Sequence, residues 1–222
     1  MNKYIDLSHD IVNNMPVYPG DSDVNLYQNK CLDKDGYTVF NLEIGMHTGT
    51  HIDTPMHLLD RNTFINEIPL DRFAGRGCLL DARNEKLIEY KPEYADIVNE
   101  NDIVILFTNY SEFYGSKEYY TNHPVISEEL ADFLIEKNIK MLGIDMPSPD
   151  RYPFEIHKKL FENNILIMEN LTNLEELLDV DDFEIIAFPL KIEAEASIVR
   201  AVARRIIIAI NKRQYKDPEC NH

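Results

Sequence analysis

The second half of the chain alternates between short continuous apolar runs and longer segments in which apolar residues recur every three or four positions. Continuous runs of this length are typical of strands buried in a sheet, and the recurring pattern is typical of amphipathic helices. The predicted strands are 102–109, 140–146 and 165–170, and the predicted helices between them are 127–138 and 153–164. This order predicts crossover units on a largely buried sheet.

Local chemistry marks the start of the first predicted helix. Ser127 can accept a hydrogen bond from a free backbone N–H of the first turn. Glu128 and Glu129 follow it, where negative charge favours the positive end of the helix dipole. We therefore expect Ser127 to be the N-cap of this helix.

The first third of the chain has a different pattern. Segments 4–11 and 37–45 are rich in β-branched and aromatic residues, with the turn-rich sequence "MPVYPGD" between them. Near the end, 183–192 continues the strand pattern, and the apolar segment 204–210 fits either a central strand or an interface, of which we favour the strand. Because no repeat and no linker interrupts the chain, we predict one domain over residues 1–222, of class α/β with an antiparallel or mixed N-terminal portion.

The charge of the chain narrows its partners. Lys and Arg number 22 against 39 Asp and Glu, which gives a formal net charge of −17 at pH 7. Such an excess of negative charge opposes binding to phosphate backbones and anionic lipid surfaces. We expect no nucleic acid and no membrane among the partners.

Two further features predict a cytoplasmic protein. No stretch approaches the roughly 18 apolar residues that span a bilayer, and the first residues lack the apolar core of a secretion signal. Cys31, Cys78 and Cys220 are odd in number and widely spaced, which suits a reducing compartment. We expect none of these cysteines to take part in function.

The sequence "HTGTHIDTPMH" carries the candidate chemistry. It places His47, His51 and His57 close together, with Asp53 among them. Imidazole and carboxylate groups are the usual ligands of zinc, manganese and iron, so this density predicts a metal site. A straight strand at about 3.3 Å per residue would put His47 and His57 roughly 33 Å apart. We therefore expect a loop or short coiled turn that bends at its glycine and proline and wraps the ion.

This segment supplies at most four ligands, so the remainder of a metal site must come from elsewhere. The remaining histidines are His9, His123, His157 and His222. Glu169 ends the predicted strand 165–170, and the carboxyl ends of strands in α/β sheets are where ligands and catalytic groups collect. By position alone, Glu169 is either a site residue or a surface residue at a strand end.

The histidine-rich segment resembles a known signature. "HTGTHIDTPMH" matches, at each fixed position, the HxGTHxDxPxH signature of the cyclase family of metal-dependent hydrolases, which includes bacterial kynurenine formamidases and isatin hydrolase. The sequences "IDLSHDIVNNMPVYPGD", "HKKLFENNILIMENL" and "FPLKIEAEASIVRAV" are similar to further segments of that family. The resemblance implies a swivelling β/β/α fold with a mixed sheet, assembled as a homodimer or homotetramer.

The resemblance also implies roles for individual residues. The implied ligands of two divalent ions are His47, His51, Asp53, His157 and Glu169. Asp53 would bridge the two ions and Glu169 would contact both, whereas His57 would be the proton donor and acceptor. Zinc (Zn²⁺) is the expected metal, and manganese (Mn²⁺) accepts the same donors.

These roles fit the hydrolysis of an amide. Divalent ions lower the pKa of a bound water toward neutrality, and His57, with an ordinary pKa near 6.5, suits the accompanying proton transfers. We expect a hydrolase that opens a C–N bond of a small amide, with N-formylkynurenine as the first substrate to try. The alternatives are a lactam or lactone hydrolase that uses the same ions, and a non-catalytic metal-dependent binding protein.

Two departures from the family pattern concern the substrate and leave the metal site intact. Tyr18 stands in the N-terminal turn where formamidases often carry tryptophan, and it can either stack on a substrate or pack on the protein's own surface. The segment 193–199, "EAEASIV", stands where relatives have a Gly- and Asp-rich turn that ends in Ser-Pro. Loss of those glycines changes the backbone conformations open to this part of the pocket wall.

Overall fold

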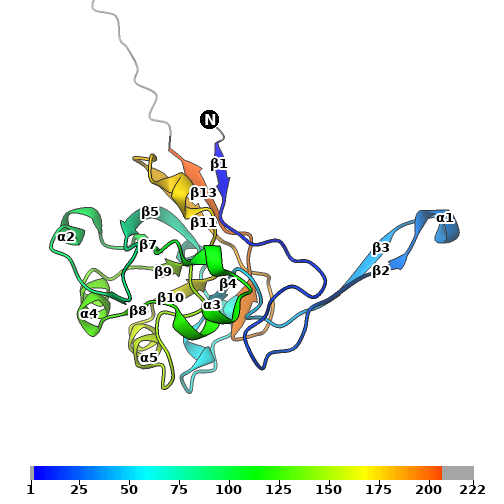
Figure 1. Cartoon of the computed structure of the whole chain (residues 1–222), viewed down its shortest axis with the longest axis horizontal. Helices are drawn as coiled ribbons and strands as arrows, with labels where there is room; N and C mark the ends of the chain where they lie inside the picture. The colour runs from blue at the N-terminus through cyan, green and yellow to red at the C-terminus, as the bar shows by residue number, and fades with distance from the viewer. Residues whose placement is uncertain (1–2, 207–222) are drawn as a thin grey trace, which may run out of the picture.

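The computed structural model of the chain describes residues 3–206, and a nine-stranded sheet forms its centre (Figure 1). The strand order is β1-β13-β11-β5-β7-β9-β10-β4-β12. These strands are β1 (Tyr4–Asp6), β4 (His51–Asp53), β5 (Ala74–Asp81), β7 (Ile103–Phe107), β9 (Met141–Ile144), β10 (Leu166–Glu169), β11 (Phe183–Ile186), β12 (Ala196–Ile198) and β13 (Val202–Arg205). Two small sheets pair β2 (Asn25–Lys30) with β3 (Val39–Glu43), and β6 (Leu87–Ile88) with β8 (Val125–Ile126).

The centre of the large sheet is parallel and both of its sides are antiparallel. β5, β7, β9 and β10 run parallel to one another. On one side β11, β13 and β1 each run antiparallel to the preceding strand, and on the other side β4 and β12 do the same. The sheet is therefore mixed, as predicted. Its parallel neighbours need crossover connections.

The helices are α1 (Leu32–Asp35), α2 (Tyr94–Ile97), α3 (Lys117–Asn122), α4 (Glu128–Glu136) and α5 (Glu155–Glu162), and short 3₁₀ helices span Pro55–His57, Ile65–Glu67, Leu70–Arg72, Tyr110–Phe113 and Leu174–Leu177. α2 to α5 lie in the crossover connections, whereas α1 lies between the antiparallel strands β2 and β3. The order β7, α4, β9, α5, β10 confirms the alternation that the apolar pattern predicts. Ser127 accepts a hydrogen bond from the backbone N–H of Leu130 at 3.1 Å, so its role as N-cap is confirmed.

The sheet separates two clusters of buried apolar side chains. Val104 and Leu106 of β7 belong to one cluster with Leu134 of α4 and Leu160 of α5. Ile105, which points to the opposite face, belongs to the second cluster with residues of β1, β11 and β13. Alternate residues of a strand face opposite sides, so burial on both faces requires a continuous apolar run.

Several predicted strands differ in extent from the observed ones, and the segment 183–192 forms a strand only over Phe183–Ile186. The segment 4–11 forms a strand only over Tyr4–Asp6. Beyond it, Ser8 makes only an isolated antiparallel bridge to Leu171. At the other end of the chain, β13 stops at Arg205 and lies between β1 and β11. The prediction of a strand for residues 207–210 lies outside the described residues.

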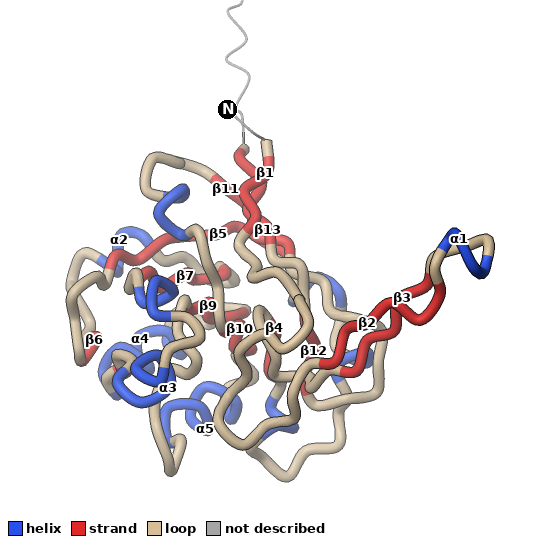
Figure 2. Tube along the Cα trace, turned by 45° about the vertical axis from the view of Figure 1, so that its right-hand side comes forward, coloured by secondary structure: helices blue, strands red, loops and turns tan. Residues whose placement is uncertain are grey.

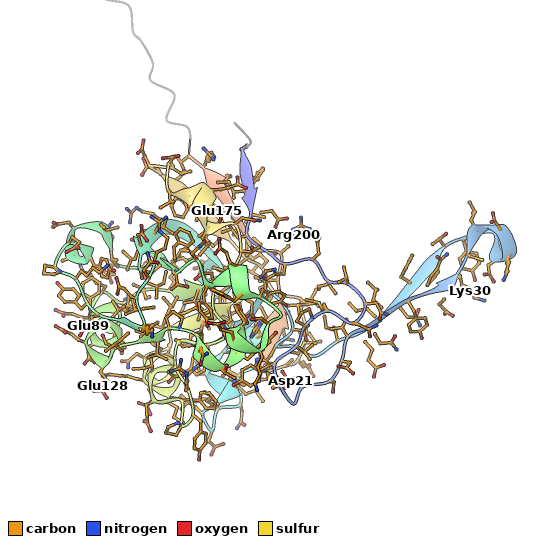
Figure 3. All side chains as sticks on the ribbon, viewed as in Figure 1. Asp21, Lys30, Glu89, Glu128, Glu175 and Arg200 are labelled. Carbon is orange, nitrogen blue, oxygen red and sulfur yellow. The ribbon has the colours of Figure 1, made fainter. Side chains whose placement is uncertain are left out.

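The hairpin of β2 and β3, with α1 at its tip, forms an arm that extends away from the body of the molecule (Figures 1 and 2). Lys30 lies well out on this arm (Figure 3). Leu32, Tyr37 and Phe40 of the arm are 65%, 53% and 57% exposed. The sequence predicted the strand in 37–45, but strand propensity does not specify the sheet that a strand joins.

Among residues 3–206, no helix has both the length and the apolar character that crossing a bilayer requires.

Candidate metal centre and substrate cavity

The segment 47–57 enters the large sheet. It turns sharply before His51, and Gly49 has φ +60°, a conformation that favours glycine. β4 follows, and Pro55 begins a 3₁₀ helix that ends at His57. The predicted bend at Gly49 is confirmed, but the prediction of a loop or coiled turn over the whole segment is wrong. β4 is fully buried, so its backbone polar groups need partners, which β10 and β12 provide.

Strand pairing brings distant residues to this segment. Glu169 of β10 lies opposite His51 in the register of β10 with β4. His157 of α5 joins them, with Nε2 3.1 Å from Oε1 of Glu169. The possible ligand atoms of His47, His51 and Asp53 all lie within 4.8 Å of one another, and so do those of Asp53, His157 and Glu169. Asp53 therefore belongs to both groups.

Two buried atoms of this cluster, Nε2 of His51 and Oδ1 of Asp53, make no hydrogen bond of regular geometry within residues 3–206, although Nδ1 of His47 lies 2.9 Å from Oδ1 of Asp53. Nδ1 of His51 lies 2.8 Å from the carbonyl oxygen of Gly49, which can only accept, so Nδ1 carries the hydrogen. In the neutral ring, Nε2 then directs a lone pair toward Oδ1 of Asp53 at 3.3 Å and Oε2 of Glu169 at 3.5 Å. A divalent cation among these three atoms would satisfy all of them, and nitrogen with carboxylate oxygen is a donor set that suits zinc or manganese.

The other two histidines of the cluster also have both ring nitrogens beside acceptors. Nδ1 of His157 lies 2.7 Å from Oδ1 of Asp150. Nδ1 of His47 lies 2.9 Å from Oδ1 of Asp53, and Nε2 of His47 lies 3.1 Å from Oε1 of Glu195. Each ring therefore has one nitrogen directed at the central carboxylates and one held by a group outside the cluster.

The carboxylates make this cluster favourable for positive charge. Burial by itself would lower the pKa of His47, but Asp53, with Glu169 and Glu195, raises it to about 9. Burial would likewise lower the pKa of His157, yet its hydrogen bonds to carboxylates raise it to about 10. Burial would raise the pKa of Asp53, but the neighbouring histidines hold it well below its usual value. Protons on the histidines offset the negative charge of the carboxylates here, and a metal ion would displace these protons.

We predict that the thermal stability of the metal-free protein depends on pH more strongly than that of the metal-loaded protein. The pKa values of His47 and His157 lie above the unfolded value of about 6.5, so their protonation stabilises the fold fully below pH 6.5 and this contribution is lost as pH rises through about 9 and 10. The thermal midpoint of chelator-treated protein should therefore decrease from pH 6.5 to pH 10 more than that of metal-loaded protein. Parallel thermal melts measure both, and alkaline effects common to the two forms cancel; a gap that stays constant across this range contradicts the prediction.

His57 has a different environment from the five clustered side chains. Its ring lies 4.3 Å from that of His47, centroid to centroid, and it belongs to neither ligand group. Within residues 3–206 its ring makes no hydrogen bond, and it lines the cavity above the cluster. Burial lowers the pKa of His57; Asp53 opposes this effect, and the neighbouring histidines add to it. His57 is therefore available in its neutral form to accept a proton.

A cavity of about 230 Å³ opens over the cluster. Its walls are mostly apolar and aromatic, and the aromatic members are Tyr18, Tyr114, Tyr120 and Phe154. Tyr18, expected to contact either a substrate or the protein surface, lines this cavity and meets the ring of Tyr120 edge-on at 5.7 Å. The other three aromatic residues were not predicted. The aromatic run "YSEFYGSKEYY" at 110–120 is the sequence signal that could have indicated Tyr114 and Tyr120.

The remaining candidate histidines lie elsewhere. His9 stacks on Tyr114 with ring centroids 3.8 Å apart, and Nε2 of His123 lies 3.0 Å from the carbonyl oxygen of Asp150. Neither joins a ligand group, and His222 lies outside the described residues. Of the three described histidines left open by the sequence, His157 is the one that the structure brings to the cluster.

A buried histidine and carboxylate cluster beneath an aromatic cavity on a curled mixed sheet is the arrangement expected of a metal-dependent hydrolase. Residues 5–151 match the sequence model of the Cyclase family, described as "Putative cyclase", and the chain belongs to this family. The chain is 30% identical over 210 residues to kynurenine formamidase of Bacillus cereus, covering 92% of this chain and 99% of that protein.

Solved structures agree on the fold. One, described as a potential metal-dependent hydrolase with cyclase activity, is 26% identical, with a TM-score of 0.74 over 93% of this chain and 99% of that one. Isatin hydrolase A from Labrenzia aggregata is 24% identical, with a TM-score of 0.79 over 90% of this chain and 92% of that one. The second likeness bears on the fold alone.

Proposed function

We propose that the protein is a metal-dependent hydrolase that cleaves the C–N bond of a small aryl formamide, with N-formylkynurenine as the first substrate to test. One observation carries the proposal: two groups of prospective ligands share Asp53 at the floor of an aromatic cavity that His57 also lines. The relationship to kynurenine formamidase of Bacillus cereus supports the choice of a formamide.

Two ions, Zn²⁺ by preference with Mn²⁺ as an alternative, fit the two ligand groups. His47 and His51 would hold the first with Asp53, and His157 and Glu169 would hold the second with the same Asp53. When bound, such ions polarise the amide carbonyl and make a water nucleophilic near neutral pH. The protein's part is to hold the ligand set in place, and the buried strands β4 and β10 carry His51, Asp53 and Glu169.

His57 would carry the proton. In its neutral form it accepts a proton from the attacking water and then delivers it to the departing nitrogen, so that the formamide and water become an amine and formic acid, which releases its proton to solvent as formate. Burial favours this neutral form by lowering the pKa of His57. A base that stands beside the ligand groups without belonging to them has the geometry that this step requires.

The cavity walls favour an aryl substrate without a net negative charge, such as the zwitterion N-formylkynurenine. Tyr18, Tyr114 and Tyr120 offer ring faces and edges against which an aromatic ring can pack. Among the described residues that line the cavity there is no Lys or Arg, whereas Asp21 is one of them. Away from the proposed ions, the walls therefore suit a neutral or positively charged part of the substrate better than an anionic one.

A substrate panel tests the proposal. Purified protein is first analysed for bound metal and then assayed against aryl formamides, lactams and lactones, with and without a chelator. We expect hydrolysis of aryl formamides that the chelator abolishes and that added Zn²⁺ or Mn²⁺ restores. Faster opening of lactams or lactones would favour the alternative hydrolase. Full metal content without any turnover would indicate a binding protein.

We also propose that the chain assembles as a homodimer or homotetramer. An isolated two-stranded hairpin has marginal stability, and its open edges invite pairing. The arm of β2 and β3 is such a hairpin, and it exposes large apolar side chains that a second copy would cover.

Light scattering tests this assembly. We expect Phe40→Glu to dissociate the oligomer, because it places a charge in the apolar surface of the arm. Lys34→Ala, which changes an exposed residue of α1 on the same arm, should leave the molar mass unchanged. A monomeric wild-type protein would contradict the proposed assembly.

Residues 1–222 would form one domain that works in the cytoplasm. The large sheet supports the first part, because it joins β1 near the start of the chain to β13 near its end. The free thiols of Cys31 and Cys78 support the second. Limited proteolysis and cell fractionation test the two parts separately.

A further inference from the structure

We infer that Glu195 is a positioning residue that holds His47 in the tautomer and orientation needed to bind a metal ion. The inference rests on the proposed metal site. Glu195 lies in the segment 193–199, where the sequence departs from the family pattern, and it is not among the residues that line the cavity. It therefore acts through His47 and does not touch the substrate.

Once an ion binds on the Asp53 side of His47, the hydrogen-bond geometry favours one tautomer of the ring. Oε1 of Glu195 lies 3.1 Å from Nε2 of His47, and an ionised carboxylate can only accept. Nε2 therefore keeps its hydrogen when Nδ1, which lies 2.9 Å from Oδ1 of Asp53, gives up its own to offer a lone pair to the ion. In the other tautomer an N–H would point to the place of the ion. Carboxylates that accept from the second nitrogen of a metal-binding histidine orient the ring in this way.

The backbone of Glu195 is fixed relative to the ligands of the first ion. Its carbonyl oxygen accepts from the backbone N–H of Thr54 at 3.1 Å and from Oγ1 of the same residue at 2.7 Å. The next residue, Ala196, begins β12 and pairs with Asp53. The backbone of Glu195 is thus fixed relative to β4, and the conformation of its side chain alone decides whether it reaches His47.

The three ligand histidines differ in how their outer nitrogens are held. The backbone carbonyl of Gly49 holds His51. Asp150 holds His157 and is itself buried, where it also accepts from the backbone N–H of Ile156 in the first turn of α5.

His47 depends on an accessible side chain in place of these buried partners. The Glu195 side chain is 37% exposed and that of His47 is 24% exposed. We therefore expect the ion at His47 to depend on Glu195, and the ion at His157 to be independent of it.

Metal affinity of the metal-free protein tests the inference directly. The probe is Zn²⁺ in competition with a chromogenic chelator, followed by the visible spectrum of Co²⁺ in the same variants. Glu195→Ala should weaken the binding of one ion by about 10- to 100-fold, the usual effect of removing such a partner, and leave the other ion in place. Glu195→Gln should stay close to wild type, because its amide oxygen still accepts from Nε2.

Glu193→Ala is the matched control, since it removes an exposed carboxylate from the same segment with no contact to His47. It should bind both ions like the wild type. Three results would overturn the inference: wild-type affinity in Glu195→Ala, equal weakening of both ions, or a Glu195→Gln variant as weak as Glu195→Ala. A wild-type protein that binds both ions but hydrolyses no amide would end the proposed function and leave this inference standing.

Discussion

Replacing Asp53 with alanine should abolish binding of both ions. Its ligand atom belongs to the group of His47 and His51 and also to the group of His157 and Glu169. Loss of this one carboxylate removes a shared ligand and much of the negative charge that holds two cations near each other. In the proposed mechanism the ions activate the water, so turnover should fall to the detection limit.

Metal analysis and thermal melts measure the consequence. The wild-type protein should gain thermal stability on addition of Zn²⁺, because a ligand that binds the folded state stabilises it by RT ln(1 + [L]/Kd). Asp53→Ala should show no such gain. Asp60→Ala, which removes an exposed aspartate close by in the sequence, should retain the gain and both ions. Full metal stoichiometry in Asp53→Ala would end the bridging role.

The central strands of the large sheet were predicted from the sequence because their burial is continuous. β7, β9 and β10 are buried along their whole length, and their apolar runs show it. β4 was predicted as a loop, because three residues with two polar side chains carry no periodic signal. It becomes a strand only through its partners β10 and β12, which lie far away in the sequence.

The candidate site divides in the same way. His47, His51, Asp53 and His57 stand in one short segment, so their density alone indicated metal chemistry. The association of His157 with Glu169 was implied only by the family resemblance. Sequence spacing could not predict it, because the contact depends on how α5 packs beside β10.

Asp150 and Glu195 were not predicted at all. Their role depends on distances of about 3 Å to a ring nitrogen. Such contacts are set by tertiary packing, and a sequence pattern of acidic residues cannot separate them from ordinary surface charges. Tyr114 and Tyr120 were missed for the same reason, because their segment meets the N-terminal turn only in the folded protein.

Replacing His57 with alanine should separate the proton carrier from the ligands. The five clustered side chains remain in this variant, so its metal content should stay close to that of the wild type. Turnover should nevertheless decrease by about 10² to 10⁴, the usual contribution of a positioned general acid or base. Because burial lowers the pKa of His57, the limb of the pH–rate profile that reports this base should lie below about 6.5 in the wild type and disappear in the variant.

Metal content decides this prediction more clearly than the pH profile, since a water activated by the ions titrates in a similar range. His51→Ala is the comparison, because His51 belongs to a ligand group and His57 does not. We expect His51→Ala to lose an ion and His57→Ala to keep both. If both variants lose one ion in the same proportion, His57 is a ligand, and another group must carry the proton to the departing nitrogen.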